Sequence, residues 1–124
     1  MDHPPGFLRL VADAKTRIRE ISVAQVEHMH TAGENVVIVD VREEEEWRRG
    51  HLPAARHLCK GIIERDIERA VPDRNAHIIL YCGGGFRSAL AADALQKMGY
   101  TRVDSMDGGW RAWTGAGLPV SREP

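Results

Sequence analysis

The sequence predicts an α/β fold with three layers, in which a mostly parallel central sheet has helices on both faces. Two short runs, VVIVD at 36–40 and HIILYC at 77–82, are continuously apolar and rich in β-branched residues, as is typical of strands buried on both faces. Helical patterns lie between these runs. Strands that alternate with helices of about 10–15 residues form right-handed βαβ units and a parallel sheet.

The chain begins with a predicted amphipathic helix. After Pro4 and Pro5, apolar residues recur at helical spacing and charged residues fill the other faces. We expect this helix to continue as far as Ile21, and we assign residues 1–20 to an N-terminal amphipathic helical extension. The apolar positions of the pattern are Phe7, Val11, Ala14, Ile18 and Ile21.

The later elements follow in a regular order. Ser22 is a typical N-cap for a short second helix that Gly33 would end. After the strand at 36–40, apolar residues at 62, 63, 67 and 70 predict a helix, and a further helix is expected over 89–98 after the strand at 77–82. A third short run, Arg102–Met106, follows the turn signal Gly99 and predicts another strand.

Composition limits the classes of function. The 124 residues fit one domain, and a formal net charge of −1 gives no basic field for binding nucleic acid. No apolar stretch approaches the roughly 20 residues of a membrane helix, and the start MDHPPGF lacks the pattern of a signal peptide, so we expect a cytoplasmic protein with no membrane partner. The two cysteines are expected to be free thiols, and no spaced Cys/His cluster predicts a metal site.

The loop after the strand at 77–82 carries the candidate chemistry. In the stretch YCGGGFRSA, Cys82 ends the strand, Gly83, Gly84 and Gly85 permit positive φ and close approach of a ligand, and Phe86 precedes Arg87 and Ser88. Cysteine reacts as the thiolate, and backbone amides at a helix N-terminus favour an anion. Arg87 adds a fixed charge, and Ser88 is expected to cap the helix and to donate its hydroxyl to the sulfur. We interpret the loop as an anion cup with a nucleophile.

Three motifs together resemble a known family. The loop YCGGGFRSA, the preceding VDVREEEEWRRGHLPAARHL and the later DGGWRAWTGAGLPV are similar to those of single-domain rhodaneses, over about Ile21 to Val120. The resemblance implies that residues 21–124 form a rhodanese-like domain with sulfurtransferase activity. It further implies that Cys82 takes sulfane sulfur from thiosulfate or a persulfide and passes it to a thiol, to cyanide or to a protein acceptor, with no metal or organic cofactor.

Two other functions stay open. Rhodanese-like domains resemble phosphatases and arsenate reductases of the same fold, and the related phosphatases have five residues between cysteine and arginine, whereas Cys82 and Arg87 are separated by four. The shorter loop favours a sulfur atom over a phosphoryl group. The other alternative is a non-catalytic binding module, although modules of that kind resemble this chain except for a lost cysteine.

Residues outside the loop are assigned mainly structural roles. Asp40 and Arg42, in VDVR, match the family's first signature and are expected to form an ion pair that supports the loop. The acidic run at 43–46 is interpreted as a solvated first helical turn, and His51 as a residue that ties down a turn. Cys59 is expected to pack beside Ile62 and Ile63, with the alternative that it resolves a Cys82 persulfide.

Overall fold

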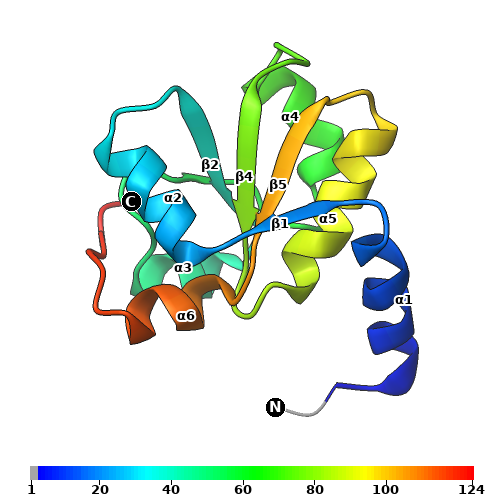
Figure 1. Cartoon of the computed structure of the whole chain (residues 1–124), viewed down its shortest axis with the longest axis horizontal. Coiled ribbons are helices and arrows are strands. Elements are labelled where there is room, and N and C mark those ends of the chain that lie inside the picture. Colours follow the sequence, from blue (N-terminus) through cyan, green and yellow to red (C-terminus); the bar gives the residue numbers. More distant parts are fainter. Residues whose placement is uncertain (1–2) are drawn as a thin grey trace.

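The computed structural model describes residues 3–124, which form a five-stranded sheet flanked by helices (Figure 1). The order of strands and helices along the chain agrees with the predicted βαβ pattern. The helices are α1 (Pro5–Lys15), α2 (Val23–Thr31), α3 (Glu44–Arg49), α4 (Ile63–Ala70), α5 (Phe86–Lys97) and α6 (Gly109–Gly115). The strands are β1 (Arg19–Ile21), β2 (Val36–Asp40), β3 (Arg56–His57), β4 (His77–Tyr81) and β5 (Arg102–Met106).

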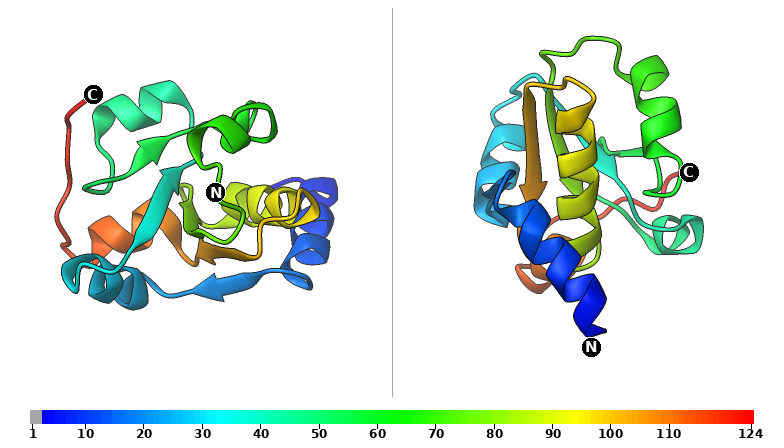
Figure 2. Two further views of the ribbon diagram at one scale, coloured as in Figure 1. Left: turned by 90° about the horizontal axis from the view of Figure 1, so that it is seen from above. Right: turned by 90° about the vertical axis from the view of Figure 1, so that its right-hand side faces the viewer.

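The sheet has the order β1-β5-β4-β2-β3, and every one of these pairings is parallel. Two apolar clusters cover its two faces. One cluster joins the sheet to α4 and α5 through residues such as Ile67 and Leu95, and the other joins it to α2 and α6 through Val26 and Trp113. Figure 2 shows the helices on either side of the sheet. The predicted three-layer α/β class is therefore confirmed.

The N-terminal prediction was wrong in part. Helix α1 ends at Lys15, and Arg19–Ile21 is an edge strand in which Ile21 pairs with Met106 of β5. Ile18 and Ile21 continue the helical spacing by coincidence, because a strand of three residues is too short to show a periodicity of its own. Met1 and Asp2, which the predicted extension includes, lie outside the described residues.

The second helix was predicted correctly. The Ser22 hydroxyl accepts a hydrogen bond from the backbone N–H of Gln25, and the Gln25 side chain accepts one from the backbone N–H of Ser22, so the two residues form a capping box. Gly33 follows the helix with φ of +70°. Within residues 3–124, no helix is long and apolar enough to cross a membrane.

Parallel pairing brings the carboxyl ends of the central strands to one edge. Asp40 pairs with Tyr81 in register, so the residues that follow β2 and β4 leave the sheet side by side. In Figure 1 the loop after β4, the start of α5, and helix α6 lie together at this lower edge. Ligands of parallel α/β sheets bind at this end of the strands.

Candidate active site

Cys82 lies directly after β4, and its side chain is held inside the loop that follows. The residue is 1% exposed, and its thiol is free. The backbone N–H groups of Gly85 and Ser88 both donate to Sγ, at N–Sγ distances of 3.2 and 3.3 Å. Converging amides of this kind favour an anion at the point where they meet. The loop can therefore stabilise negative charge on sulfur.

Helix α5 begins earlier than the sequence indicated. Its first residue is Phe86 and its N-cap is Gly85, with φ of +99°, so the prediction that Ser88 caps the helix was wrong. Ser88 is the third residue of the helix, and its Oγ is 3.5 Å from Sγ of Cys82 and 2.8 Å from Oγ of Ser105. The thiol can donate to this hydroxyl, whereas a thiolate would accept from it.

The three loop glycines have different roles. Of Gly83, Gly84 and Gly85, only Gly85 has a positive φ. At Gly83, an added Cβ would lie 3.0 Å from Nη2 of Arg87, and at Gly84 it would lie 2.5 Å from Nη2 of Arg111. Gly83 and Gly84 therefore leave room for two guanidinium groups, a reason for glycine that the sequence did not reveal.

Arg87 is paired with Glu46 from α3. Nη1 of Arg87 is 2.8 Å from Oε1 of Glu46, and Nη2 is 3.2 Å from Oε2. The guanidinium holds the pKa of Glu46 below its ordinary value, and the carboxylate in turn raises the pKa of Arg87. The acidic run was expected to be solvated throughout, and for Glu46 this was wrong, because Glu46 is a wall of the pocket that contains Cys82.

Arg111 is a second cation that the sequence analysis missed. Its backbone N–H donates to the carbonyl oxygen of Gly83 at 3.1 Å, and its side chain crosses Gly84 and lines the same pocket. Among residues 3–124, no carboxylate lies within ion-pair distance of its exposed guanidinium. The only sequence feature that could have indicated a role for Arg111 is its position directly after the Gly108-Gly109-Trp110 segment.

Helix α6 holds the loop in place by its backbone. The N–H of Trp110 donates to the carbonyl oxygen of Cys82 at 2.7 Å. Gly109 has φ of +54°, and a Cβ there would overlap that same carbonyl oxygen. The glycine is therefore required for the close approach of α6 to the cysteine.

Asp40 and Arg42 form a buried ion pair next to Trp110. Asp40 accepts from Nη2 of Arg42 at 2.7 Å and from the hydroxyl of Tyr81 at 2.6 Å. Arg42 also donates to the carbonyl oxygen of Gly50 at 2.7 Å, and its guanidinium lies 4.5 Å from the ring centroid of Trp110. The pair thus connects the end of β2 with the α6 residue that binds Cys82.

His51 and Cys59 do not line the pocket in the described structure. The ring nitrogens of His51 lie 3.0 Å from the carbonyl oxygen of Leu52 and 2.5 Å from that of Glu123, contacts that fasten a turn to the C-terminal segment. Cys59 is a half-buried free thiol in the segment before α4. Among residues 3–124, no cluster of three or more His, Cys, Asp or Glu side chains is placed to hold a metal.

The pocket above Cys82 has a volume of about 540 Å³. Besides the loop, it is lined by aromatic rings from three segments: Phe7 of α1, Phe86 of α5 and Trp110 of α6. Its charged groups are Glu46, Arg87 and Arg111. The site therefore combines a buried thiol, whose sulfur accepts two backbone N–H hydrogen bonds, with a wide, largely aromatic entrance.

Comparison with known proteins gives consistent matches. A family model described as a Rhodanese-like domain matches residues 22–116. Thiosulfate sulfurtransferase GlpE of Ectopseudomonas mendocina (strain ymp) is 32% identical over 98 residues, which are 79% of this chain and 86% of that protein. YrkF of Bacillus subtilis (strain 168) is 34% identical over 79% of this chain, and the chain spans about half, 52%, of the length of YrkF.

A solved structure extends the similarity to nearly the whole chain. A protein of unknown function from Rhodopseudomonas palustris, described as a possible tyrosine phosphatase, is 31% identical. The two structures superpose with a TM-score of 0.88, and the match covers 98% of each chain. The part of this chain that precedes the family model at residue 22, α1 included, is therefore also present in a structural neighbour.

Proposed function

Since the chain belongs to the rhodanese-like domain family, we propose that it is a sulfurtransferase that carries sulfane sulfur on Cys82. The supporting observation is the pair of amides, from Gly85 and Ser88, that donate to Sγ of this one buried thiol. A persulfide anion formed on Cys82 needs the same kind of stabilisation, supplied by dipoles that are fixed before the reaction. The positions of the catalytic loop are then Cys82 and Gly83–Ser88, with Asp40 and Arg42 as support.

In the first step, the Cys82 thiolate attacks the outer sulfur of a donor such as thiosulfate or a persulfide. A bond forms between Sγ and that sulfur, and the sulfur–sulfur bond of the donor breaks. Its electron pair leaves with the rest of the donor, which is sulfite when the donor is thiosulfate. The enzyme then holds Cys82–S–S⁻.

In the second step, a thiophilic acceptor attacks the outer sulfur of the Cys82 persulfide. The acceptor is a thiolate, cyanide or a cysteine of a protein, and the electron pair of the broken bond returns to Sγ. The thiolate is restored, so the cycle is complete. Both steps are displacements at sulfur and require neither a metal nor an organic cofactor.

A phosphatase is the second candidate, because the R. palustris neighbour is described as a possible tyrosine phosphatase. The loop of this chain argues against it in two ways. Only four residues separate Cys82 from Arg87, and Arg87 is already neutralised by Glu46. A phosphoryl dianion would meet a carboxylate at the position where it needs a free guanidinium.

The two candidates are separated by one pair of assays on the same protein. We expect thiocyanate to form from a sulfane-sulfur donor and cyanide, and p-nitrophenyl phosphate not to be hydrolysed. Cys82→Ser should abolish thiocyanate formation, and Cys59→Ser, at the other free thiol, should preserve it. Hydrolysis of the phosphate ester that depends on Cys82, without thiocyanate formation, would replace the proposal with the phosphatase. If neither activity occurs, the non-catalytic binding module is supported.

A further inference from the structure

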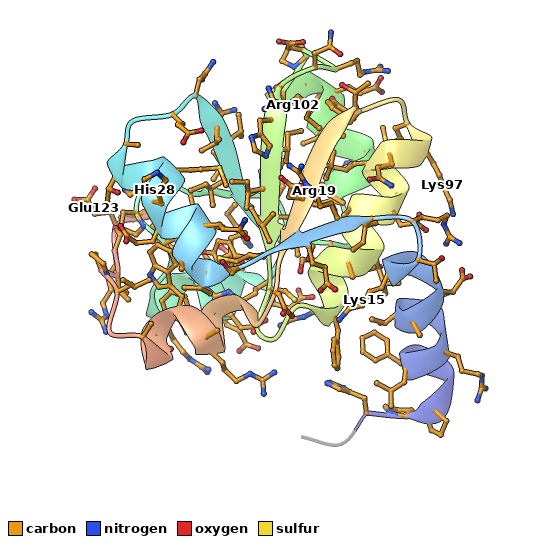
Figure 3. All side chains as sticks on the ribbon, in the orientation of Figure 1. Lys15, Arg19, His28, Lys97, Arg102 and Glu123 are labelled. Atoms are coloured by element: carbon orange, nitrogen blue, oxygen red, sulfur yellow. The ribbon has the colours of Figure 1, made fainter. Side chains whose placement is uncertain are left out.

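The N-terminal helix contributes to the pocket of Cys82, although the family model begins only at residue 22. His3 and Phe7 both line the pocket, and they belong to the segment before β1. Figures 1 and 3 show α1 alongside the lower part of α5, with Lys15 directed towards α5. The segment that contains α1 therefore adds residues to the pocket of Cys82 that the family model does not include.

Several contacts fix α1 in this position. Val11 and Ala14 are 3% and 1% exposed, and they face the body of the protein. Immediately after the helix, Arg17 donates to both carboxylate oxygens of Asp93 in α5, at 2.9 and 2.8 Å. These interactions leave the first turn of α1 to extend beyond the start of α5. The C-terminal half of α1 is thus anchored to the body of the protein, and the first turn continues from this anchored part of the helix.

Three rings at the pocket entrance form an aromatic wall, defined here as His3, Phe7 and Phe86. The centroid of Phe86 is 5.0 Å from that of His3 and 6.2 Å from that of Phe7, both with edge-to-face geometry. Nζ of Lys15 lies 5.2 Å from the Phe86 centroid. Aromatic pairs of this geometry stabilise one another and offer a large apolar surface to a ligand.

The pocket is larger and more apolar than thiosulfate requires. Cavities of roughly 300–1,000 Å³ bind organic ligands, and this one has a volume of about 540 Å³. Because Cys82 forms its floor, the ligand must present a sulfur atom there. The rest of the ligand then lies between the aromatic wall and Trp110, with the unpaired Arg111 nearby to bind negative charge.

We propose that the aromatic wall selects sulfur donors in which the sulfane sulfur is attached to a large apolar organic group, in preference to donors with a small group or with none, such as thiosulfate. This inference rests on the proposed sulfurtransferase function and names the substrate class. The organic group packs against Phe7 and Phe86 while the outer sulfur reaches Cys82. Phe7 is then a specificity-determining residue from outside the family domain.

Two thiosulfonates test the proposal, because they carry the same reacting group on a large or a small substituent. In benzenethiosulfonate and methanethiosulfonate, the Cys82 thiolate takes the outer sulfur, and the broken bond leaves its electron pair on a sulfinate. Cyanide then removes the sulfur as thiocyanate, which is measured. The decisive quantity is the ratio of kcat/KM for the benzene donor to kcat/KM for the methane donor, compared between full-length variants, so that the intrinsic reactivities cancel.

We expect Phe7→Ala to lower this ratio about fivefold or more, mainly through a higher KM for the benzene donor. Leu10→Ala is the matched control, since Leu10 lies on the same helix and is 56% exposed. It should leave the ratio unchanged. If Phe7→Ala proves unstable, Phe7→Leu keeps the helix and an apolar side chain and should lower the ratio to a smaller extent.

An unchanged ratio in the Phe7 variants, with both donors still used, would overturn the selectivity proposal and leave the sulfurtransferase function intact. If wild type forms no thiocyanate from either thiosulfonate or from thiosulfate, the proposed function fails, and the selectivity proposal fails with it. The two failures are therefore distinguishable.

Discussion

The guanidinium of Arg87 faces the carboxylate of Glu46 through two contacts, of 2.8 and 3.2 Å, at the entrance to the cysteine pocket. Arg87 comes from the first turn of α5, and Glu46 comes from the first turn of α3. Because Arg87 lowers the pKa of Glu46, this carboxylate is ionised at neutral pH. The Arg87–Glu46 pair has a net charge close to zero, and it places a carboxylate where a dianionic donor would enter.

Glu46→Gln should improve the use of thiosulfate. Glutamine can keep the hydrogen bond to the backbone N–H of Glu43, so the start of α3 is preserved while the negative charge is removed. We expect KM for thiosulfate to fall about fivefold to tenfold, since a charged group that repels the dianion is lost. Steady-state kinetics measures this. Glu44→Gln, at an exposed position of the same helix, should have no effect, and a higher KM in Glu46→Gln would contradict the explanation.

Arg111→Gln should weaken the binding of anionic donors. The exposed guanidinium crosses Gly84 beside Cys82, and it does not touch the sulfur in the described structure. We expect KM to rise about fivefold with kcat nearly unchanged, and the effect to shrink as salt is added. Arg69→Gln, an exposed change in α4, is the control. A fall in kcat with constant KM would show that Arg111 acts on the chemical step instead.

Gly109→Ala should destabilise the protein and reduce activity together. The added Cβ would overlap the carbonyl oxygen of Cys82, and φ of +54° is unfavourable for alanine. We expect the free energy of unfolding to fall by about 2–4 kcal/mol, as measured by denaturant titration. Gly115→Ala, in the same helix with no atom within 4 Å of the new Cβ, should change it little. Equal stabilities of the two variants would exclude a tight contact between α6 and the loop.

The pairing of Asp104 predicts an acid-sensitive part of the stability. Burial alone would raise the pKa of Asp104, but hydrogen bonds from Arg19 and His77 hold it below its ordinary value. Because the pKa of Asp104 is lower in the folded state, ionised Asp104 stabilises the protein when the pH is above its pKa in the unfolded chain, near 3.9. This contribution is lost as the pH falls through the lower pKa of the folded state. The free energy of unfolding of wild type should therefore decrease below about pH 4.

In Asp104→Asn this part of the pH dependence should be missing, and stability at neutral pH should be lower by about 2 kcal/mol. Asp107→Asn, at an exposed position just after β5, should retain the pH dependence of wild type. Parallel curves for wild type and Asp104→Asn would contradict the assignment of the acid sensitivity to this pair.

The sequence predicted the elements that repeat a strong local pattern. The runs at 36–40 and 102–106 are strands with those bounds, and the run at 77–82 is a strand up to Tyr81. The runs at 36–40 and 77–82 are recognisable because nearly all their positions are apolar, whereas the run at 102–106 was indicated by Val103, Met106 and the turn signal Gly99 before it. The edge strand Arg19–Ile21 was missed because two of its three residues are exposed and charged. Local periodicity cannot distinguish such a segment from the end of a helix.

The candidate site was predictable where it is contiguous in the chain. Cys82 was placed correctly at the end of a strand, and the amides of the loop do converge on it, although only those of Gly85 and Ser88 donate to Sγ. Glu46 is 41 positions from Arg87, and no spacing rule indicates that pair. Phe7 and Arg111 likewise reach the pocket only through packing of α1 on α5 and of α6 on the loop.

The central claim is that Cys82 carries the transferred sulfur, and intact-protein mass spectrometry tests it most directly. After incubation with benzenethiosulfonate or thiosulfate and removal of the donor, wild type and Cys59→Ser should each be heavier by one sulfur atom. Cyanide should remove this atom and release thiocyanate. Cys82→Ser should show no added sulfur, whereas an adduct that persists in Cys82→Ser, or that maps to Cys59 in wild type, would contradict the account.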